Sequence, residues 1–200
     1  MIRIARPPTH LLYLHGFRSS PMSFKARRLQ AWLAEHRPGL HWWCPQLPPS
    51  PAEAMALIEQ GLADWPPGDF AVCGSSLGGF YATAVAERHA CPAVLINPAV
   101  DPARDLAAYI GEQTAWHNPD QHFDFRAQYV DELRALTLPA ITRPERYLAI
   151  VAQGDEVLDW REMVARYPGA RLHLVTGSDH ALSDFEHHLS HLTEFLNLCD

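Results

Sequence analysis

The chain has 200 residues, of which 48% are hydrophobic and 20% charged, and this composition is typical of one ordinary globular domain spanning residues 1–200. Sixteen Lys and Arg residues against 23 Asp and Glu residues give a net charge of −7, which argues against nucleic acid as a partner because phosphate binding requires a basic surface. We therefore expect a small-molecule substrate, and the sequence does not indicate an oligomeric state.

Cysteine usage and the N-terminus both indicate a cytoplasmic protein. The four cysteines form no C-x-x-C motif and no tight cluster, so a disulfide framework is not expected. Residues 1–10 contain two arginines and two prolines and lack the apolar core of a signal peptide. No apolar run approaches the roughly 20 residues that a membrane-spanning helix needs.

Six short segments are predicted to be strands. Four of them are continuous apolar runs, which lie at residues 11–14, 70–73, 93–96 and 147–151. Such runs are typical of strands that are covered on both faces in a parallel sheet. Residues 40–43 and 171–175 are more mixed in character, so we expect these two strands nearer the edges of the sheet.

Capping residues followed by proline mark several predicted helix starts. Ser50-Pro51-Ala52-Glu53 combines a capping serine, a proline at the first helical position and a glutamate that closes a capping box. Ser20-Pro21 and Asp101-Pro102 repeat the first two features, and a first helix is expected over residues 21–36. A further box at Ser183–Glu186 predicts a last helix that ends near Leu196. Alternating strands and helices predict a doubly wound α/β fold with right-handed crossovers.

Residues 97–145 interrupt this alternation. They contain no convincing strand, although a helical pattern extends from about Phe125 to Leu136. Connections of this length are uncommon and often serve as lids or binding loops. We therefore expect residues 97–145 to be a lid-like or substrate-binding insert within the single domain.

The motif G-x-S-x-G at Gly74–Gly78 lies between a predicted buried strand and a predicted helix. This context is the one that a nucleophile elbow requires, because the sharp strand-to-helix turn exposes the central serine hydroxyl. We therefore expect Ser76 to be the nucleophile of a serine hydrolase, whereas its neighbour Ser75 lacks the symmetric flanking glycines. The amide of Leu77, at the start of the helix, is expected to donate to an oxyanion.

A serine nucleophile needs a base that is oriented by a third group, and the chain order in this fold is serine, acid, histidine. Asp155 and His180 each follow a predicted strand, so both are expected at the carboxyl edge of the sheet. Asp155 is preferred as the acid. Asp159 and Glu156 are the alternatives, although Asp159 is equally suited to cap a helix that begins near Trp160.

The loop after the first strand is expected to supply a second oxyanion donor. Gly16 lets this loop fold tightly, and the amide of Phe17 is the natural partner of the amide of Leu77. His15 is interpreted as a residue that braces the loop by hydrogen bonds rather than as a base. Arg18 is either solvated or binds an acidic part of the substrate.

Several sequence blocks are specific beyond the general motif. They are LYLHGF at 12–17, SSP at 19–21, PQLPP at 45–49, GSSLGG at 74–79, NPAV at 97–100, GDEVLD at 154–159 and DHA at 179–181. In these blocks the chain resembles the YqiA-like esterases, a family of small bacterial α/β-hydrolases, over almost its whole length. The resemblance implies an α/β-hydrolase fold and esterase activity, with fatty acyl-CoA thioesters among the candidate substrates. It also implies Ser76, Asp155 and His180 as the catalytic triad.

A histidine cluster near the C-terminus is the main candidate for a metal site. His187, His188 and His191 form H-H-x-x-H without the glutamate of H-E-x-x-H, so a solvated helix face is the preferred interpretation. No metal or cofactor is expected.

The predicted function is a serine esterase or thioesterase that forms an acyl-enzyme. An acyltransferase or amidase with the same triad, and a ligand-binding protein without turnover, are the alternatives.

Overall fold

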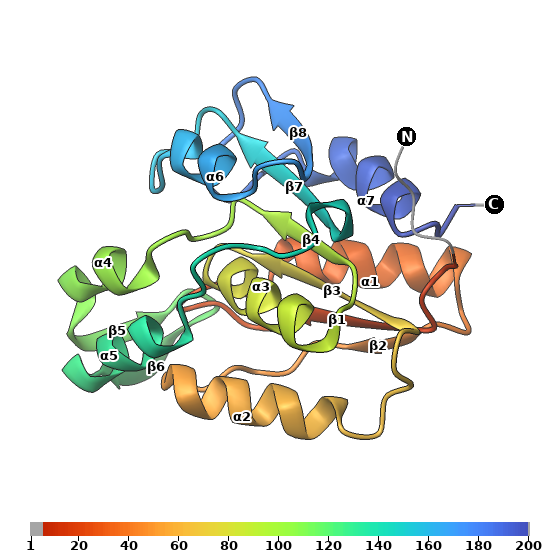
Figure 1. Cartoon of the computed structure of the whole chain (residues 1–200). Helices are drawn as coiled ribbons and strands as arrows, with labels where there is room; N and C mark the ends of the chain where they lie inside the picture. Colours follow the sequence, from red (N-terminus) through yellow and green to blue (C-terminus); the bar gives the residue numbers. More distant parts are fainter. Residues whose placement is uncertain (1–5, 200) are drawn as a thin grey trace.

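A computed structural model describes residues 6–199 and contains a six-stranded sheet with the order β2-β1-β3-β4-β7-β8 (Figure 1). These strands are β1 (His10–Leu14), β2 (His41–Trp43), β3 (Phe70–Ser75), β4 (Ala93–Ile96), β7 (Tyr147–Ala152) and β8 (Arg171–Val175). Every neighbouring pair is parallel. All six predicted strands are confirmed, and the two mixed segments, β2 and β8, form the edges as expected.

Helices cover both faces of the sheet. They are α1 (Phe24–His36), α2 (Pro51–Leu62), α3 (Leu77–His89), α4 (Pro102–Leu106), α5 (Ala127–Leu136), α6 (Trp160–Arg166) and α7 (Leu189–Phe195), with short 3-10 turns η1 (Ala107–Tyr109), η2 (Pro144–Arg146) and η3 (Phe185–His188). Helices α1 and α7 pack on one face, and α2, α3 and α6 pack on the other. Within residues 6–199, no helix has the length and apolar character needed to cross a bilayer. The predicted α/β architecture is confirmed.

The central strands are apolar throughout because each face contacts a different layer of helices. In β1, Leu12 and Leu14 pack with α2 and α3, whereas Leu11 and Tyr13 pack with α1 and α7. All four side chains are fully buried. Burial of each leucine contributes roughly 1.5–3 kcal/mol, so the alternating sides of one strand hold both layers to the sheet.

Two predicted helix starts differ from the structure. Helix α1 begins at Phe24 and not at Pro21, because the hydroxyl of Ser20 accepts a hydrogen bond from the amide of Met22 and so stabilises a separate turn before the helix. The last helix does not begin at Ser183. The hydroxyl and amide of Ser183 both donate to Asp179, at 2.6 and 2.9 Å, so this serine closes a turn instead of capping a helix.

The predicted start of α2 is correct, but within residues 6–199 the carboxylate that binds this helix start belongs to Glu132 and not to Glu53. The hydroxyl of Ser50 accepts from the amide of Glu53, as a helix cap does. The same hydroxyl donates to Glu132 of α5 at 2.6 Å, and Glu132 also accepts from the amide of Ala52. An acidic side chain near a helix N-terminus is stabilising, so Glu132 anchors α5 to the main body.

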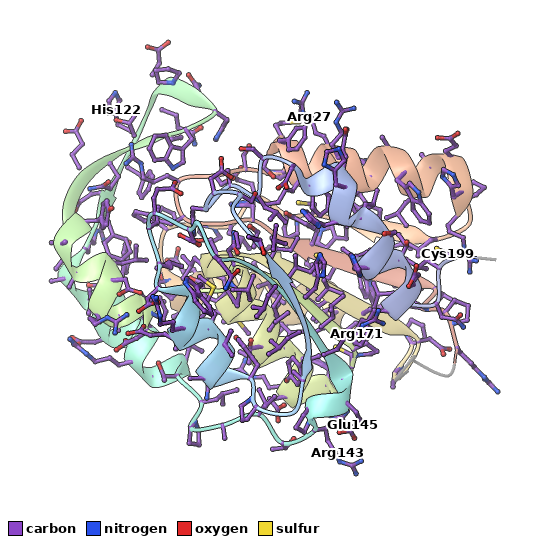
Figure 2. All side chains as sticks on the ribbon, turned by 90° about the horizontal axis from the view of Figure 1, so that it is seen from above. Arg27, His122, Arg143, Glu145, Arg171 and Cys199 are labelled. Atoms are coloured by element: carbon purple, nitrogen blue, oxygen red, sulfur yellow. The ribbon has the colours of Figure 1, made fainter. Side chains whose placement is uncertain are left out.

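The segment 97–145 contains a β-hairpin that the sequence analysis did not predict. Strands β5 (Gly111–Ala115) and β6 (Asn118–Phe125) pair antiparallel, while the predicted helix is present as α5. Most of β6 is exposed, so its residues show no apolar run, and only the alternation of Phe123 and Phe125 indicates a strand. The hairpin and α4 and α5 group at one end of the sheet (Figure 1), and the hairpin residue His122 lies at the periphery (Figure 2).

Helix α3 approaches the sheet closely at two glycines. A Cβ atom at Gly74 would lie closer than 3.0 Å to the carbonyl oxygen of Gly78, and a Cβ at Gly78 would lie equally close to the carbonyl oxygen of Leu14. Real Cβ atoms essentially never come this near to a backbone oxygen. Only glycine at these positions therefore allows the first turn of α3 to lie against β1 and β3.

We predict that Gly78→Ala lowers the free energy of unfolding by about 3 kcal/mol, because the backbone of either α3 or β1 must move to accept the methyl group. Gly39→Ala is the matched control, since a Cβ there would meet nothing within 4 Å. Urea denaturation of both variants measures the difference. Equal stability of the two variants would contradict the described packing.

Candidate active site

Ser76 occupies the sharp turn between β3 and α3. Its φ of 55° and ψ of −122° are unusual for a residue with a side chain. The turn is held by hydrogen bonds from the amide of Ser76 to the carbonyl of Ile96, at 3.0 Å, and from the amide of Gly79 to the carbonyl of Ser76, at 2.8 Å. Such backbone strain costs about 1–3 kcal/mol and persists only where surrounding contacts enforce it.

A continuous hydrogen-bonded chain joins Ser76, His180 and Asp155. The Nε2 atom of His180 lies 3.0 Å from the Oγ atom of Ser76, and the Nδ1 atom of His180 lies 2.7 Å from the Oδ2 atom of Asp155. Because an ionised carboxylate only accepts, Nδ1 carries the proton and Nε2 accepts from the serine hydroxyl. The structure thus brings together the three residues that the sequence analysis selected as nucleophile, base and acid.

The carboxylate of Asp155 is fully buried and firmly oriented. Its Oδ1 atom accepts hydrogen bonds from the amides of Val157 and Leu158, at 2.9 and 2.8 Å, which leaves Oδ2 directed at His180. Asp159, the alternative acid, accepts from the amide of Arg161 and caps α6. Of the two aspartates, only Asp155 contacts the histidine.

The loop that follows β1 lies directly against Ser76. A Cβ added at Gly16 would be 3.2 Å from the Cβ atom of Ser76 and 3.6 Å from its Oγ atom. Among residues 6–199, no backbone or side-chain oxygen accepts a hydrogen bond from the amide of Phe17 or of Leu77. Phe17 and Leu77 both line the same cavity. Their position and free hydrogens suit an oxyanion hole.

His15 braces this loop, as the sequence indicated. Its Nδ1 atom donates to the carbonyl of Gly16 at 3.0 Å, and its Nε2 atom accepts from the amide of Leu47 at 3.1 Å. Burial lowers the pKa of His15 from 6.5 to about 4, although the bond to Gly16 opposes this shift. At neutral pH the ring is therefore uncharged, which is the state that these two hydrogen bonds require.

A cavity of about 320 Å³ lies between the loop after β1, the start of α3 and the hairpin. Its lining is largely apolar and consists of His15, Gly16, Phe17, Arg18, Ser19, Gln46, Leu47, Pro48, Pro49, Leu77, Tyr81, Ala115, His117, Gln121 and Phe123. The hairpin residues of this lining were not predicted from the sequence, because β5 and β6 were not predicted. The period-two spacing of Phe123 and Phe125 was the available signal.

Arg18 links the loop after β1 to the hairpin. Its Nε atom donates to the carbonyl of Thr114 at 2.6 Å, and the amide of Trp116 donates to the carbonyl of Arg18 at 2.8 Å. The guanidinium carbon also lies 4.1 Å from the centre of the Trp116 ring, within the range of a cation–π interaction. Arg18 is thus half-buried and engaged in binding the hairpin, not merely solvated.

The histidines near the C-terminus do not form a solvated helix face. His191 stacks on His173 of β8 with ring centres 3.6 Å apart, and His188 lies within hydrogen-bonding distance of His173. His188 and His191 are half-buried, and only His187 is exposed. Within residues 6–199, no group of three or more histidine, cysteine or acidic side chains has a geometry that could hold a metal ion. The ring contacts to β8 pack α7 against the edge of the sheet.

Comparison with known proteins identifies the family of this chain. The model of an uncharacterised protein family, UPF0227, matches residues 10–197. The chain belongs to this family. Its members are usually called YqiA-like esterases, so the resemblance found in the sequence is confirmed.

Solved structures with the same fold include several α/β hydrolases. Alpha/beta hydrolase domain-containing protein 10 from mouse is 17% identical with a TM-score of 0.70, and the match covers 94% of this chain and 89% of the mouse chain. Est1E from Butyrivibrio proteoclasticus, solved with ferulic acid bound, is also 17% identical with a TM-score of 0.70, and the match covers 94% of this chain and 86% of Est1E. A structure from work on the metagenome-derived lipolytic enzymes LipS and LipT is 19% identical with a TM-score of 0.66, and the match covers 96% of this chain and 94% of that one. The chain therefore has the α/β-hydrolase fold.

We predict that His15 makes stability depend on pH between 6.5 and 4. Its pKa is lower in the folded state, so the unfolded state binds more protons in this range and stability falls as the pH falls. The loss reaches about 3 kcal/mol at pH 4. Denaturation of wild type and His15→Gln across this range tests the effect, because the stability advantage of the wild type should shrink toward pH 4. A constant difference would contradict the lowered pKa.

Proposed function

We propose that this protein is a serine esterase or thioesterase that hydrolyses carboxylic esters through an acyl-enzyme. The observation that carries the proposal is the hydrogen-bonded chain from Ser76 through His180 to Asp155, with distances of 3.0 and 2.7 Å. A serine hydroxyl is a weak nucleophile at its own pKa and becomes reactive when an oriented base accepts its proton. The amides of Phe17 and Leu77, which have no acceptor among residues 6–199, support the same chemistry.

In the first half of the proposed reaction, the Oγ atom of Ser76 attacks the acyl carbon while His180 takes the hydroxyl proton. Negative charge develops on the former carbonyl oxygen, and the amides of Phe17 and Leu77 donate to it. The carbonyl re-forms as the bond to the alcohol or thiol leaving group breaks. His180 gives its proton to that leaving group, and the acyl group remains on Ser76.

In the second half, water takes the place of the leaving group. His180 removes a proton from the water, the hydroxide attacks the acyl-enzyme, and the same two amides stabilise the oxyanion. The carbonyl re-forms as the bond between the acyl carbon and the Oγ atom of Ser76 breaks, His180 returns its proton to that Oγ atom, and the carboxylic acid is released. Throughout, Asp155 orients the imidazole and stabilises its charged form without being protonated.

The cavity beside the amides suits the acyl part of an ester. Its volume of about 320 Å³ and its apolar walls, including Leu47, Tyr81 and Phe123, favour an aliphatic or aromatic group. We propose that residues 97–145 act as a substrate-binding insert within a single domain, since the hairpin forms one wall of this cavity. The positive charge of Arg18 at its border is proposed to attract an acidic part of the substrate.

We predict that Ser76→Ala abolishes both hydrolysis of p-nitrophenyl acyl esters and labelling by a fluorophosphonate. The variant lacks the oxygen that forms the covalent bond. Alanine keeps the Cβ atom that lies against the loop at Gly16, so we expect the fold to be retained. Ser75→Ala is the matched control and should keep both activities. Retained labelling in a folded Ser76→Ala protein would overturn the proposal.

The acid is tested separately by two conservative changes. We expect Asp155→Asn to lower kcat about 10⁴-fold, because the amide favours the wrong tautomer of His180. Asp159→Asn should leave kcat nearly unchanged, since asparagine caps a helix as well as aspartate. Steady-state kinetics and circular dichroism of both variants provide the measurement. A larger loss in Asp159→Asn than in Asp155→Asn would assign the acid to the other residue.

A further inference from the structure

His180 lies in an irregular loop between β8 and η3, so no ladder of backbone hydrogen bonds fixes its position. Instead, side chains from other parts of the fold hold both peptide groups of this residue. The amide of His180 donates to the Oε2 atom of Glu156 at 2.9 Å, and its carbonyl accepts from the Nδ2 atom of Asn97 at 3.0 Å. The base is therefore held by its backbone on both sides.

Asn97 uses each part of its amide group. The Nδ2 atom donates to the carbonyls of both Asp179 and His180, at 3.1 and 3.0 Å, and the Oδ1 atom accepts from the amide of Ala152 at 2.8 Å. The residue is fully buried. In such surroundings an unpaired polar group costs about 1–3 kcal/mol, so breaking any of these three hydrogen bonds would be destabilising.

The position of Asn97 in the chain connects the three segments that carry the candidate triad. It directly follows Ile96, whose carbonyl accepts a hydrogen bond from the amide of Ser76. Ala152, which it also binds, ends the strand that precedes Asp155. A displacement of Asn97 would therefore change the distances from His180 to both of its partners.

We infer that Asn97 and Glu156 are positioning residues that set the geometry of His180 relative to Ser76 and Asp155. The inference rests on the proposed function. Neither side chain contacts the reacting atoms, so each acts through the backbone of His180. Lys25 supports the same loop from α1, because its Nζ atom donates to the carbonyl of Ala181.

The residue type at position 97 follows from this role. Its φ of 41° lies in the left-handed region, which asparagine tolerates better than most residues with a side chain. Aspartate tolerates it too, but a carboxylate offers no hydrogen to the carbonyls of Asp179 and His180. Glycine also fits the backbone but provides neither donor nor acceptor.

The test uses Asn97→Asp and Asn97→Gly, with the same changes at Asn197 as controls. Asn197 also has a positive φ, of 52°, and lies beyond the end of α7. We expect kcat for ester hydrolysis to fall about 10²-fold in both Asn97 variants with KM little changed, as for a catalytic group displaced by about 1 Å. The Asn197 variants should match the wild type.

A spectroscopic signal separates positioning from general stability. The hydrogen bond between the Nδ1 atom of His180 and Asp155 is short, at 2.7 Å, and charge-assisted. We expect its proton to resonate far downfield in proton NMR. It should weaken or shift in folded Asn97 variants and persist in the Asn197 variants. Normal kcat together with an unchanged resonance in a folded Asn97 variant would overturn the inference.

Glu156 provides a test that does not depend on a buried substitution. Its side chain is exposed, so Glu156→Ala is expected to fold, to lower kcat and to alter the same resonance, while Glu156→Gln keeps an acceptor oxygen and should restore most of the activity. Equal activity of the wild type, Glu156→Ala and Glu156→Gln would contradict the positioning role of Glu156. If the Asn97 variants also fail to fold, that equal activity overturns the whole inference. Failure of fluorophosphonate to label the wild type at Ser76 would instead refute the proposed function.

Discussion

The close contact between the first turn of α3 and the sheet is the constraint on which the rest of the site depends. Gly78 lies against the carbonyl of Leu14, and Gly74 lies against the backbone of Gly78, so the chain must turn sharply at Ser76. The positive φ of this serine is a consequence of that turn. Because β1 and β3 are neighbours in the sheet, the same contact brings the loop at Gly16 beside the serine hydroxyl.

Sheet topology then determines where the other groups meet. Strands β4, β7 and β8 follow β3 in order across the sheet, and parallel pairing places the loops after all of them at one edge. Asp155 and His180 lie in the loops after β7 and β8, and Asn97 follows β4, between these two strands and β3. Hydrogen bonds across this edge, rather than regular structure, align the groups.

Much of the fold and of the candidate site was predictable from the sequence because both depend on local patterns. Continuous apolar runs indicate buried parallel strands, and a G-x-S-x-G motif between a strand and a helix indicates an elbow. The β5–β6 hairpin was not predicted, since most of β6 is exposed and carries no apolar run. The roles of Ser20, Ser183 and Asn97 were also missed, because each depends on a hydrogen bond whose partner no sequence pattern specifies.

The proposed chemistry requires that Ser76 carries the acyl group during turnover. Acid quenching of the wild-type protein during hydrolysis of a slow p-nitrophenyl ester, followed by peptide mass spectrometry, measures this directly. We predict one acyl group per chain, attached to Ser76, and an initial burst of one p-nitrophenol per chain. Turnover without an acyl adduct on Ser76, or with the adduct on another residue, would contradict it.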